Sequence, residues 1–241
     1  MPDYREAQAI VLRVQEHREA DRRIHLLTPQ GRLVARAPGA RKAKSRLGGV
    51  LQPAAVVQVT LYELGRVPTI TGASSIEAFR PLQEDLRRLA AAQVLLEICD
   101  VTVGEEDAVR PFVVLAKALR RLGEAPDPAA AWLAGEIDLL AAYGWGLELL
   151  RCVACGGELR PPLRYPVDLG GFVCGRCAAQ GGVSASEDAL LAMRSALREE
   201  EPGAGAAEAR QLLHLTWQAH LESPLRSVGF AESVFGAVGD R

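Results

Sequence analysis

The chain has 241 residues, of which 49% are hydrophobic and 24% charged, a composition typical of a folded globular protein and not of a disordered one. This length allows one large or two small domains, and no apolar run approaches the roughly 18 residues that a membrane helix needs. The opening MPDYREAQAIVLRV carries charges where a signal peptide has an apolar run, so we expect a cytoplasmic protein that does not bind membranes.

The charge is unevenly distributed along the chain. The formal net charge is −2, yet residues 1–80 hold 13 Lys and Arg against 7 Asp and Glu. Residues 81–241 hold 15 against 23. The N-terminal part therefore has the electrostatics of a protein that binds a polyanion, whereas the remainder is acidic.

Residues 1–75 are predicted to form short strands separated by turns. The strand-like runs are AIVLRV (9–14), RIHLLT (23–28), RLVARA (32–37), AVVQVTLY (55–62) and VPTITGA (67–73). Five strands in about 65 residues indicate a small barrel. Residues 38–53 are expected to form a loop before the last two strands, which ELGR (63–66) joins in a hairpin.

Alanine- and leucine-rich helical periodicity begins after the last strand. The predicted helices cover residues 82–103, 110–122, 128–143, 184–200 and 208–223, followed by a short tail. Ser184 stands three residues before Glu187, which is the spacing of a capping box. We therefore expect a barrel domain over 1–78 and a helical domain over 79–241, with a cysteine module inserted at about 150–182.

Four of the five cysteines form two C-x-x-C pairs, CVAC (152–155) and CGRC (174–177), separated by 18 residues. This spacing is typical of a four-cysteine zinc site. The predicted ligands of one structural Zn²⁺ are Cys152, Cys155, Cys174 and Cys177. CGRC alone also resembles a redox dithiol, but no strand–turn–helix context precedes it. Cys99, in an apolar helix, is predicted to be a packed core residue.

The segment GARKAKSRLGG (39–49) places four cations between glycines, and no acidic residue occurs between Asp21 and Glu63. The four cations repel one another, and binding of a polyanion relieves this repulsion, so the run favours contact with nucleic acid. A nuclear import signal has the same composition and stays an alternative. Few aromatic residues accompany it, so we expect contacts with phosphates and little sequence selectivity. The sequence contains no P-loop, G-x-S-x-G or H-E-x-x-H motif, so we do not expect an enzyme.

The order of AIVLRV, EADRRIHLLTPQGRL, PGARKAKSRLGGVLQP and VTLYELGRV resembles the RecO family of bacterial DNA repair and recombination mediators. The helices with C-x-x-C pairs and the terminal HLESPLRSVGF extend the resemblance over nearly the whole chain. It implies an α+β protein: an N-terminal OB-fold β-barrel, then an α-helical domain with an inserted four-cysteine zinc module. It also implies binding and not catalysis: of single- and double-stranded DNA, with annealing of complementary strands. With RecR, such a protein helps to load RecA onto DNA covered by single-strand DNA-binding protein.

The resemblance also suggests binding residues. The family's basic OB surface falls on Arg13, Arg22, Arg23, Arg32, Arg36, Arg41, Lys42, Lys44 and Arg46. The acidic C-terminal tail of single-strand DNA-binding protein is expected in an apolar groove of the helical domain rimmed by Arg210 or Arg226. The alternative is a zinc-bearing RNA-binding or translation-associated protein, because a barrel with a zinc ribbon occurs in that class too.

Overall fold

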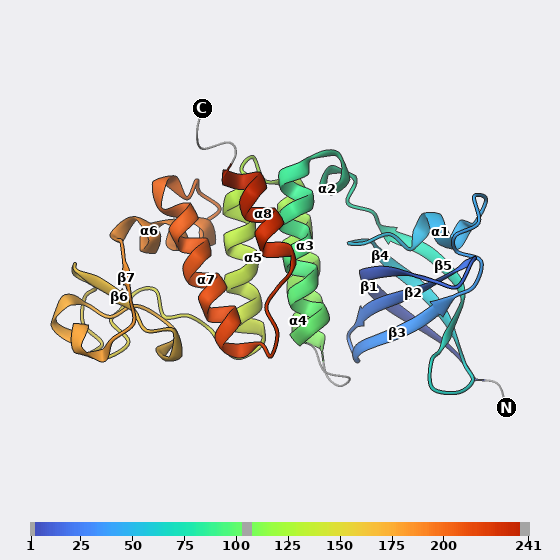
Figure 1. The fold of residues 1–241 in the computed structure, drawn as a ribbon, viewed down its shortest axis with the longest axis horizontal. Helices are drawn as coiled ribbons and strands as arrows, with labels where there is room; N and C mark the ends of the chain where they lie inside the picture. The colour runs from blue at the N-terminus through green and yellow to red at the C-terminus, as the bar shows by residue number, and fades with distance from the viewer. Residues whose placement is uncertain (1–2, 103–107, 237–241) are drawn as a thin grey trace.

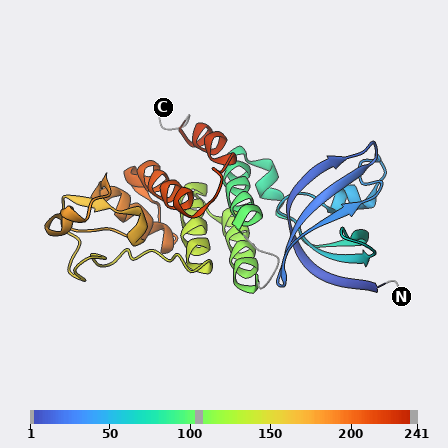
Figure 2. The same ribbon diagram turned by 60° about the horizontal axis from the view of Figure 1, so that its bottom comes forward.

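The structure is a computed structural model, and it describes residues 3–102 and 108–236. The chain forms three parts in a row: a β-barrel at one end, long helices in the middle, and a small module of short strands and loops at the other end (Figure 1). A second view gives the same order (Figure 2). None of the helices in these two ranges is both long and apolar enough to span a membrane.

Five strands form the barrel around an apolar interior. They are β1 (Asp3–His17), β2 (Asp21–Thr28), β3 (Gly31–Ala37), β4 (Val56–Glu63) and β5 (Thr69–Glu77). They close in the order β1-β2-β3-β5-β4, with β3 parallel to β5 and the other pairs antiparallel. Ile24, Leu26 and Val59 point inward, because successive side chains of a strand face opposite sides. The arrangement is that of an OB-fold, so the predicted barrel is confirmed.

The first strand is longer than the sequence indicated. Residues 3–10 of β1 pair with β4, and residues 10–17 pair with β2. A bulge between Val11 and Arg13 lets one strand serve both neighbours, since a bulge bends and twists the strand that carries it. The polar start of β1 concealed its strand character, because Tyr4, Arg5 and Glu6 are all exposed and show no alternation.

Residues 38–53 contain a short helix where an open loop was expected. Ser45 caps α1 (Arg46–Val50) by accepting a hydrogen bond from the backbone N–H of Gly48. A Cβ at position 48 would lie 2.2 Å from the carbonyl oxygen of Ala40, so only glycine fits this close approach. The basic segment is therefore folded over much of its length.

Seven helices follow the barrel within the described ranges. They are α2 (Arg80–Glu84), α3 (Leu86–Thr102), α4 (Val109–Glu124), α5 (Pro128–Ala142), α6 (Glu187–Leu197), α7 (Ala206–His220) and α8 (Ser227–Gly236). The predicted helix over 82–103 is interrupted at Asp85, and its last residue lies outside the described residues. The predicted cap Ser184 lies in a strand, and Ser186 caps α6 by accepting from the N–H of Ala189.

The helix α8 occupies the place where a short tail was expected, and it lies against α3 (Figure 1). Glu97 of α3 accepts hydrogen bonds from the backbone N–H groups of Arg226 (3.0 Å) and Ser227 (2.8 Å). Ala231 and Phe235 bury the inner face of α8. The N-terminus of α8 is capped by a residue of another helix, so this helix depends on a tertiary contact and could not be predicted from its local sequence.

Apolar residues on the outside of the barrel pack into the core of the helices, which is separate from the barrel interior. Ile10, Leu12 and Leu27 point outward from the barrel and join the cluster formed by the helices. The N–H of Ala108, just before α4, donates to the carbonyl of Pro29 in the β2–β3 turn. Apolar packing therefore crosses the predicted boundary between a barrel domain (1–78) and a helical domain (79–241). The division into two domains stays a prediction.

The cysteine module follows α5 and contains little regular structure. It includes β6 (Leu163–Tyr165), β7 (Val183–Ala185) and 3₁₀ turns at Val167–Leu169 and Gly175–Gln180; a third 3₁₀ turn, Gly203–Gly205, precedes α7. The Tyr165 hydroxyl lies 2.7 Å from the Thr216 hydroxyl on α7. Arg194 on α6 donates to the carbonyl of Leu149. These bonds attach one side of the module to the helices.

Candidate metal centre and nucleic-acid interface

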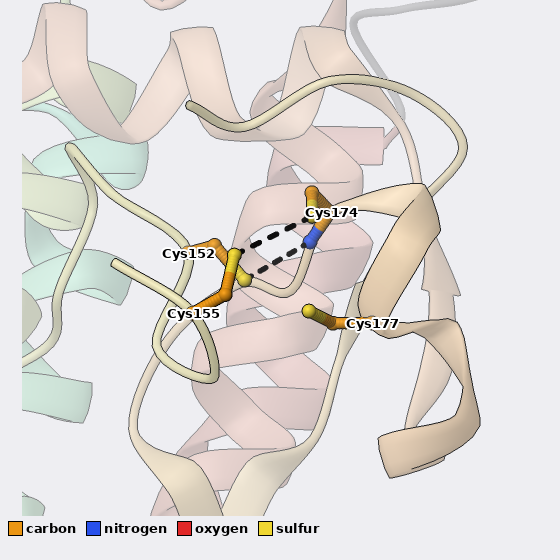
Figure 3. Close-up of side chains that lie close together, drawn as sticks. All are labelled: Cys152, Cys155, Cys174 and Cys177. Atoms are coloured by element: carbon orange, nitrogen blue, oxygen red, sulfur yellow. Dashed lines mark hydrogen bonds between the residues drawn. The ribbon is translucent and has the colours of Figure 1, made fainter. Parts of the chain in front are cut away.

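The four predicted cysteine ligands come together in the module (Figure 3). Their Sγ atoms all lie within 4.8 Å of one another, and Cys155 Sγ is 4.0 Å from Cys174 Sγ. A tetrahedral zinc ion with Zn–S bonds of about 2.3 Å holds its sulfurs about 3.8 Å apart, whereas a disulfide requires about 2.05 Å. The spacing fits four ligands of one metal ion.

Neighbouring groups shift the pKa values of these thiols in opposite directions. Burial alone would raise the pKa of Cys152, but backbone N–H groups, first that of Cys174 at 3.4 Å, lower it to about 6. The pKa of Cys177 is raised to about 12, first by its contact with Cys155. Four thiolates this close therefore need a cation to be deprotonated together at neutral pH.

The predicted core residue Cys99 is fully buried, which confirms its assignment. Burial raises the pKa of its thiol to about 12. This thiol is inert near neutral pH, unlike the four of the module.

Among the predicted DNA contacts, Arg23 and Arg36 lie opposite each other on β2 and β3. Both point outward, because the neighbouring Ile24 and Ala35 fill the barrel interior. Neither guanidinium takes part in an ion pair or hydrogen bond with the residues that the structure describes. The two form a pair of cations on the outer face of the barrel.

Arg13 and Arg32 lie nearer the helices and contact a buried carboxylate. Asp100 of α3 is 7% exposed, and its oxygens are 2.9 Å from Arg13 Nε and 3.3 Å from Arg32 Nη1. His25 Nδ1 is 2.8 Å from the same carboxylate. Burial raises the pKa of Asp100, but the hydrogen bond with His25 and the neighbouring positive charges lower it below its ordinary value. Two predicted phosphate contacts are thus already paired within the chain.

The basic segment 39–46 continues directly from β3 and packs against the β1–β2 turn. The N–H of Arg41 donates to the carbonyl of Ala20, and its guanidinium donates to the carbonyl of Arg18 and lies 3.3 Å from Glu16. Arg22 donates to the carbonyl of Gly48 in α1. The exposed cations of the segment without an ion pair to described residues are Lys42, Lys44 and Arg46.

Arg210 and Arg226, predicted to rim a groove, occupy different environments. Arg210 is 6% exposed, and its guanidinium pairs with Glu232 of α8 at 3.1 and 3.3 Å and faces the ring of Trp132. Arg226 is exposed at the start of α8. The structure therefore places Arg210 beneath α8, away from the exposed rim where the sequence placed it.

The carboxylate of Asp100 is a site residue that sequence reasoning missed. Its signal was a carboxylate in the largely apolar stretch LLEICDVTV, which also contains Glu97; a charge among apolar residues is unusual unless a partner is present. Its partners come from β1, β2 and β3, so only the folded chain reveals them.

The fold joins an OB-fold that has outward arginines to helices and a four-cysteine cluster, which defines a class of barrel-and-helix proteins. The family model "Recombination protein O N terminal" matches residues 1–79, and "Recombination protein O C terminal" matches residues 83–228. The chain belongs to the RecO family, which confirms the resemblance seen in its sequence.

Curated relatives agree with the family models along nearly their whole length. A protein named DNA repair protein RecO from Frankia casuarinae is 35% identical, covering 96% of this chain and 99% of the relative. Proteins of the same name from Thermobifida fusca and Myxococcus xanthus are each 33% identical; the alignments cover 93% and 94% of this chain and 97% and 96% of the relatives.

Proposed function

We propose that the chain is a DNA-binding mediator of repair and recombination that holds strands and catalyses no reaction. Its family and the names of its relatives support this role. The observation that carries it is the outward pair Arg23 and Arg36, which adjoins the exposed cations of segment 39–46. Such a role places the protein on DNA in the cytoplasm.

The arrangement suits annealing of complementary strands. Cations on the outside of a barrel neutralise phosphates of single- or double-stranded DNA and release counterions. Phosphate contacts position a strand without reading it, and they leave the base edges free to pair. A protein that neutralises two strands in this way lowers their mutual repulsion.

Partner proteins fit the remaining surface. We infer that the helical part, with its acidic balance, contacts RecR and assists RecA loading on DNA covered by single-strand DNA-binding protein. The acidic tail of the latter has a candidate seat beside α8, in a cavity of about 400 Å³ lined by Arg87 and Phe235. The buried Arg210, which is paired with Glu232, also lines this cavity, as do Asp127 and Glu201. Arg226 offers a further exposed cation at the other end of α8.

We propose Zn²⁺ as the ion of the four-cysteine centre. A set of four thiolates is typical of structural zinc, and the sulfur spacing supports this choice. With all four positions taken by protein ligands, the ion would stabilise the fold of the module and present no open position to a substrate.

A competition experiment tests DNA binding against the alternative of an RNA-binding protein. A labelled single-stranded DNA oligonucleotide is bound to the protein and displaced by unlabelled DNA or RNA of equal length and sequence. We expect DNA to compete at least as well as RNA, and the protein to accelerate annealing of complementary DNA strands. Selective displacement by RNA, with no acceleration of DNA annealing, would contradict the proposal.

A further inference from the structure

A continuous row of side chains crosses the outer surface of the barrel from the arginine pair to two tyrosines. Strand pairing places Arg23 opposite Arg36, Arg36 opposite Thr69, Thr69 opposite Tyr62, and Tyr62 opposite Tyr4. Neighbouring strands lie about 4.8 Å apart, so the row follows the backbone for about 20 Å around the barrel. We call these five residues the outer row.

All members of the outer row face away from the barrel interior. Their neighbours along the strands, Ala35, Leu61 and Ile70 among them, are buried in the interior. Residues paired across strands point to the same side of the sheet. Because the row takes one residue from each strand of the closed barrel, it curves around the barrel, with positive charge on β2 and β3 and aromatic rings on β4 and β1.

The two tyrosines form an exposed aromatic surface. Their ring centroids are 5.1 Å apart with an interplanar angle of 44°, and Tyr4 is 62% exposed. Neither hydroxyl takes part in a hydrogen bond with the described residues. A large aromatic side chain this exposed retains a ring face for a further stacking partner.

The charges around the tyrosines disfavour a phosphate there. Arg5 is 2.9 Å from Glu63 and is neutralised by it, while Glu6 is exposed and adds negative charge beside Tyr4. A flexible chain that curves around the barrel along the outer row can therefore place most of its phosphates near the arginines and a planar base on the tyrosine rings, with the phosphate of that base directed away from Glu6.

Resting on the DNA binding proposed above, we propose that Tyr4 and Tyr62 form a base-stacking platform for single-stranded DNA. A strand that curves around the barrel along the outer row contacts Arg23 and Arg36 through its phosphates and stacks one or two bases on the tyrosine rings. Duplex DNA does not use this platform, because its bases are already stacked inside the helix. Stacking accepts any base, so the platform adds affinity without sequence selectivity.

The test compares an ordinary single strand with a strand of equal length made only of abasic sugar-phosphate units. The wild-type protein should bind the ordinary strand about 10-fold more tightly, since each stacked base contributes a factor of that order. The double variant Tyr4→Leu, Tyr62→Leu keeps an apolar cross-strand contact without an aromatic face. It should bind both strands alike, with an unchanged salt slope.

The matched control is Tyr4→Phe, Tyr62→Phe, which keeps both rings and should retain the preference for the ordinary strand. Thermal unfolding of both variants separates a loss of stacking from a loss of folding. Equal binding of the two strands by the wild type would overturn the platform but leave DNA binding intact. Failure to bind either strand would instead overturn the proposed function. A preference retained by the folded leucine variant would place the stacking surface elsewhere.

Discussion

The barrel and the cysteine module are both small, yet they are stabilised in different ways. The barrel encloses its own cluster of buried apolar side chains, including Leu26, Val57 and Leu61. The local core of the module consists of Cys152, Val173 and Cys174. Outward residues of the barrel can therefore bind a ligand without affecting the stability of its core. In the module, the same cysteines form the candidate metal site and stabilise the fold.

The largest expected effect is on the module. Cys174→Ser, or removal of metal by a chelator, should destabilise the module by several kcal/mol, with an upper bound of about 10 kcal/mol. A metal ion bound by the four cysteines would hold the loops of the module together. Loss of the ion should therefore expose Tyr165 and Phe172, which pack on the helices. Thermal unfolding with and without chelator measures the change, and DNA affinity should remain close to that of the wild type.

Thiol titration provides the control for this prediction. In the native protein the four metal ligands and the buried Cys99 should all resist a thiol reagent, and all five should react after denaturation with chelator. Metal analysis should find one zinc per chain. If the protein as purified contained no metal and its four module thiols reacted rapidly in the native state, the zinc assignment would be refuted.

A smaller effect is expected where the barrel meets the helices. Asp100→Asn should destabilise the protein by about 1–3 kcal/mol at neutral pH, because Arg13 and Arg32 lose a charged partner but retain access to solvent. Urea unfolding at several pH values measures it. If the arginines are thereby released for phosphates, affinity for DNA should rise.

The pH dependence follows from the lowered pKa of Asp100. The ionised carboxylate stabilises the folded chain fully above its unfolded pKa of about 3.9, and this contribution is lost as the pH falls through the lower folded pKa. The difference between wild type and Asp100→Asn should therefore shrink in acid below about pH 4. A difference that stays constant from neutral pH into this range would show that the charge of Asp100 does not stabilise the fold.

The smallest effect distinguishes the two candidate caps of α6. Ser186→Ala should cost about 1–2 kcal/mol, because its hydroxyl accepts from the N–H of Ala189 and donates to Glu208. Ser184→Ala, at an exposed strand position, should change stability by no more than about 0.5 kcal/mol. Equal effects in thermal unfolding would contradict the observed cap.

The elements with strong local patterns could be predicted from sequence. Alternation and turn residues located the barrel strands, and C-x-x-C spacing located the four cysteines that the structure brings together. The start of β1 was missed because its partner, β4, lies about 50 residues away in the chain, which hid the Tyr4–Tyr62 pair. The helix α8 and the Asp100 cluster also depend on distant partners.

The most direct test of the central claim is the salt dependence of single-strand binding. Replacement of Arg41, Lys42, Lys44 and Arg46 by alanine removes up to four phosphate contacts, each worth about 0.7 in the log–log slope. Because Arg41 is partly engaged by Glu16 and Arg18, the slope should become shallower by about 2 to 3.

The matched control removes four exposed cations from outside the barrel, and these are Arg110, Lys117, Arg160 and Arg198. It changes the net charge equally, so it separates local contacts from the general field of the protein. We predict a near wild-type slope for the control and a shallower slope for the barrel variant, with both proteins folded. Equal slopes for the two variants would contradict the claim that the barrel surface binds DNA phosphates.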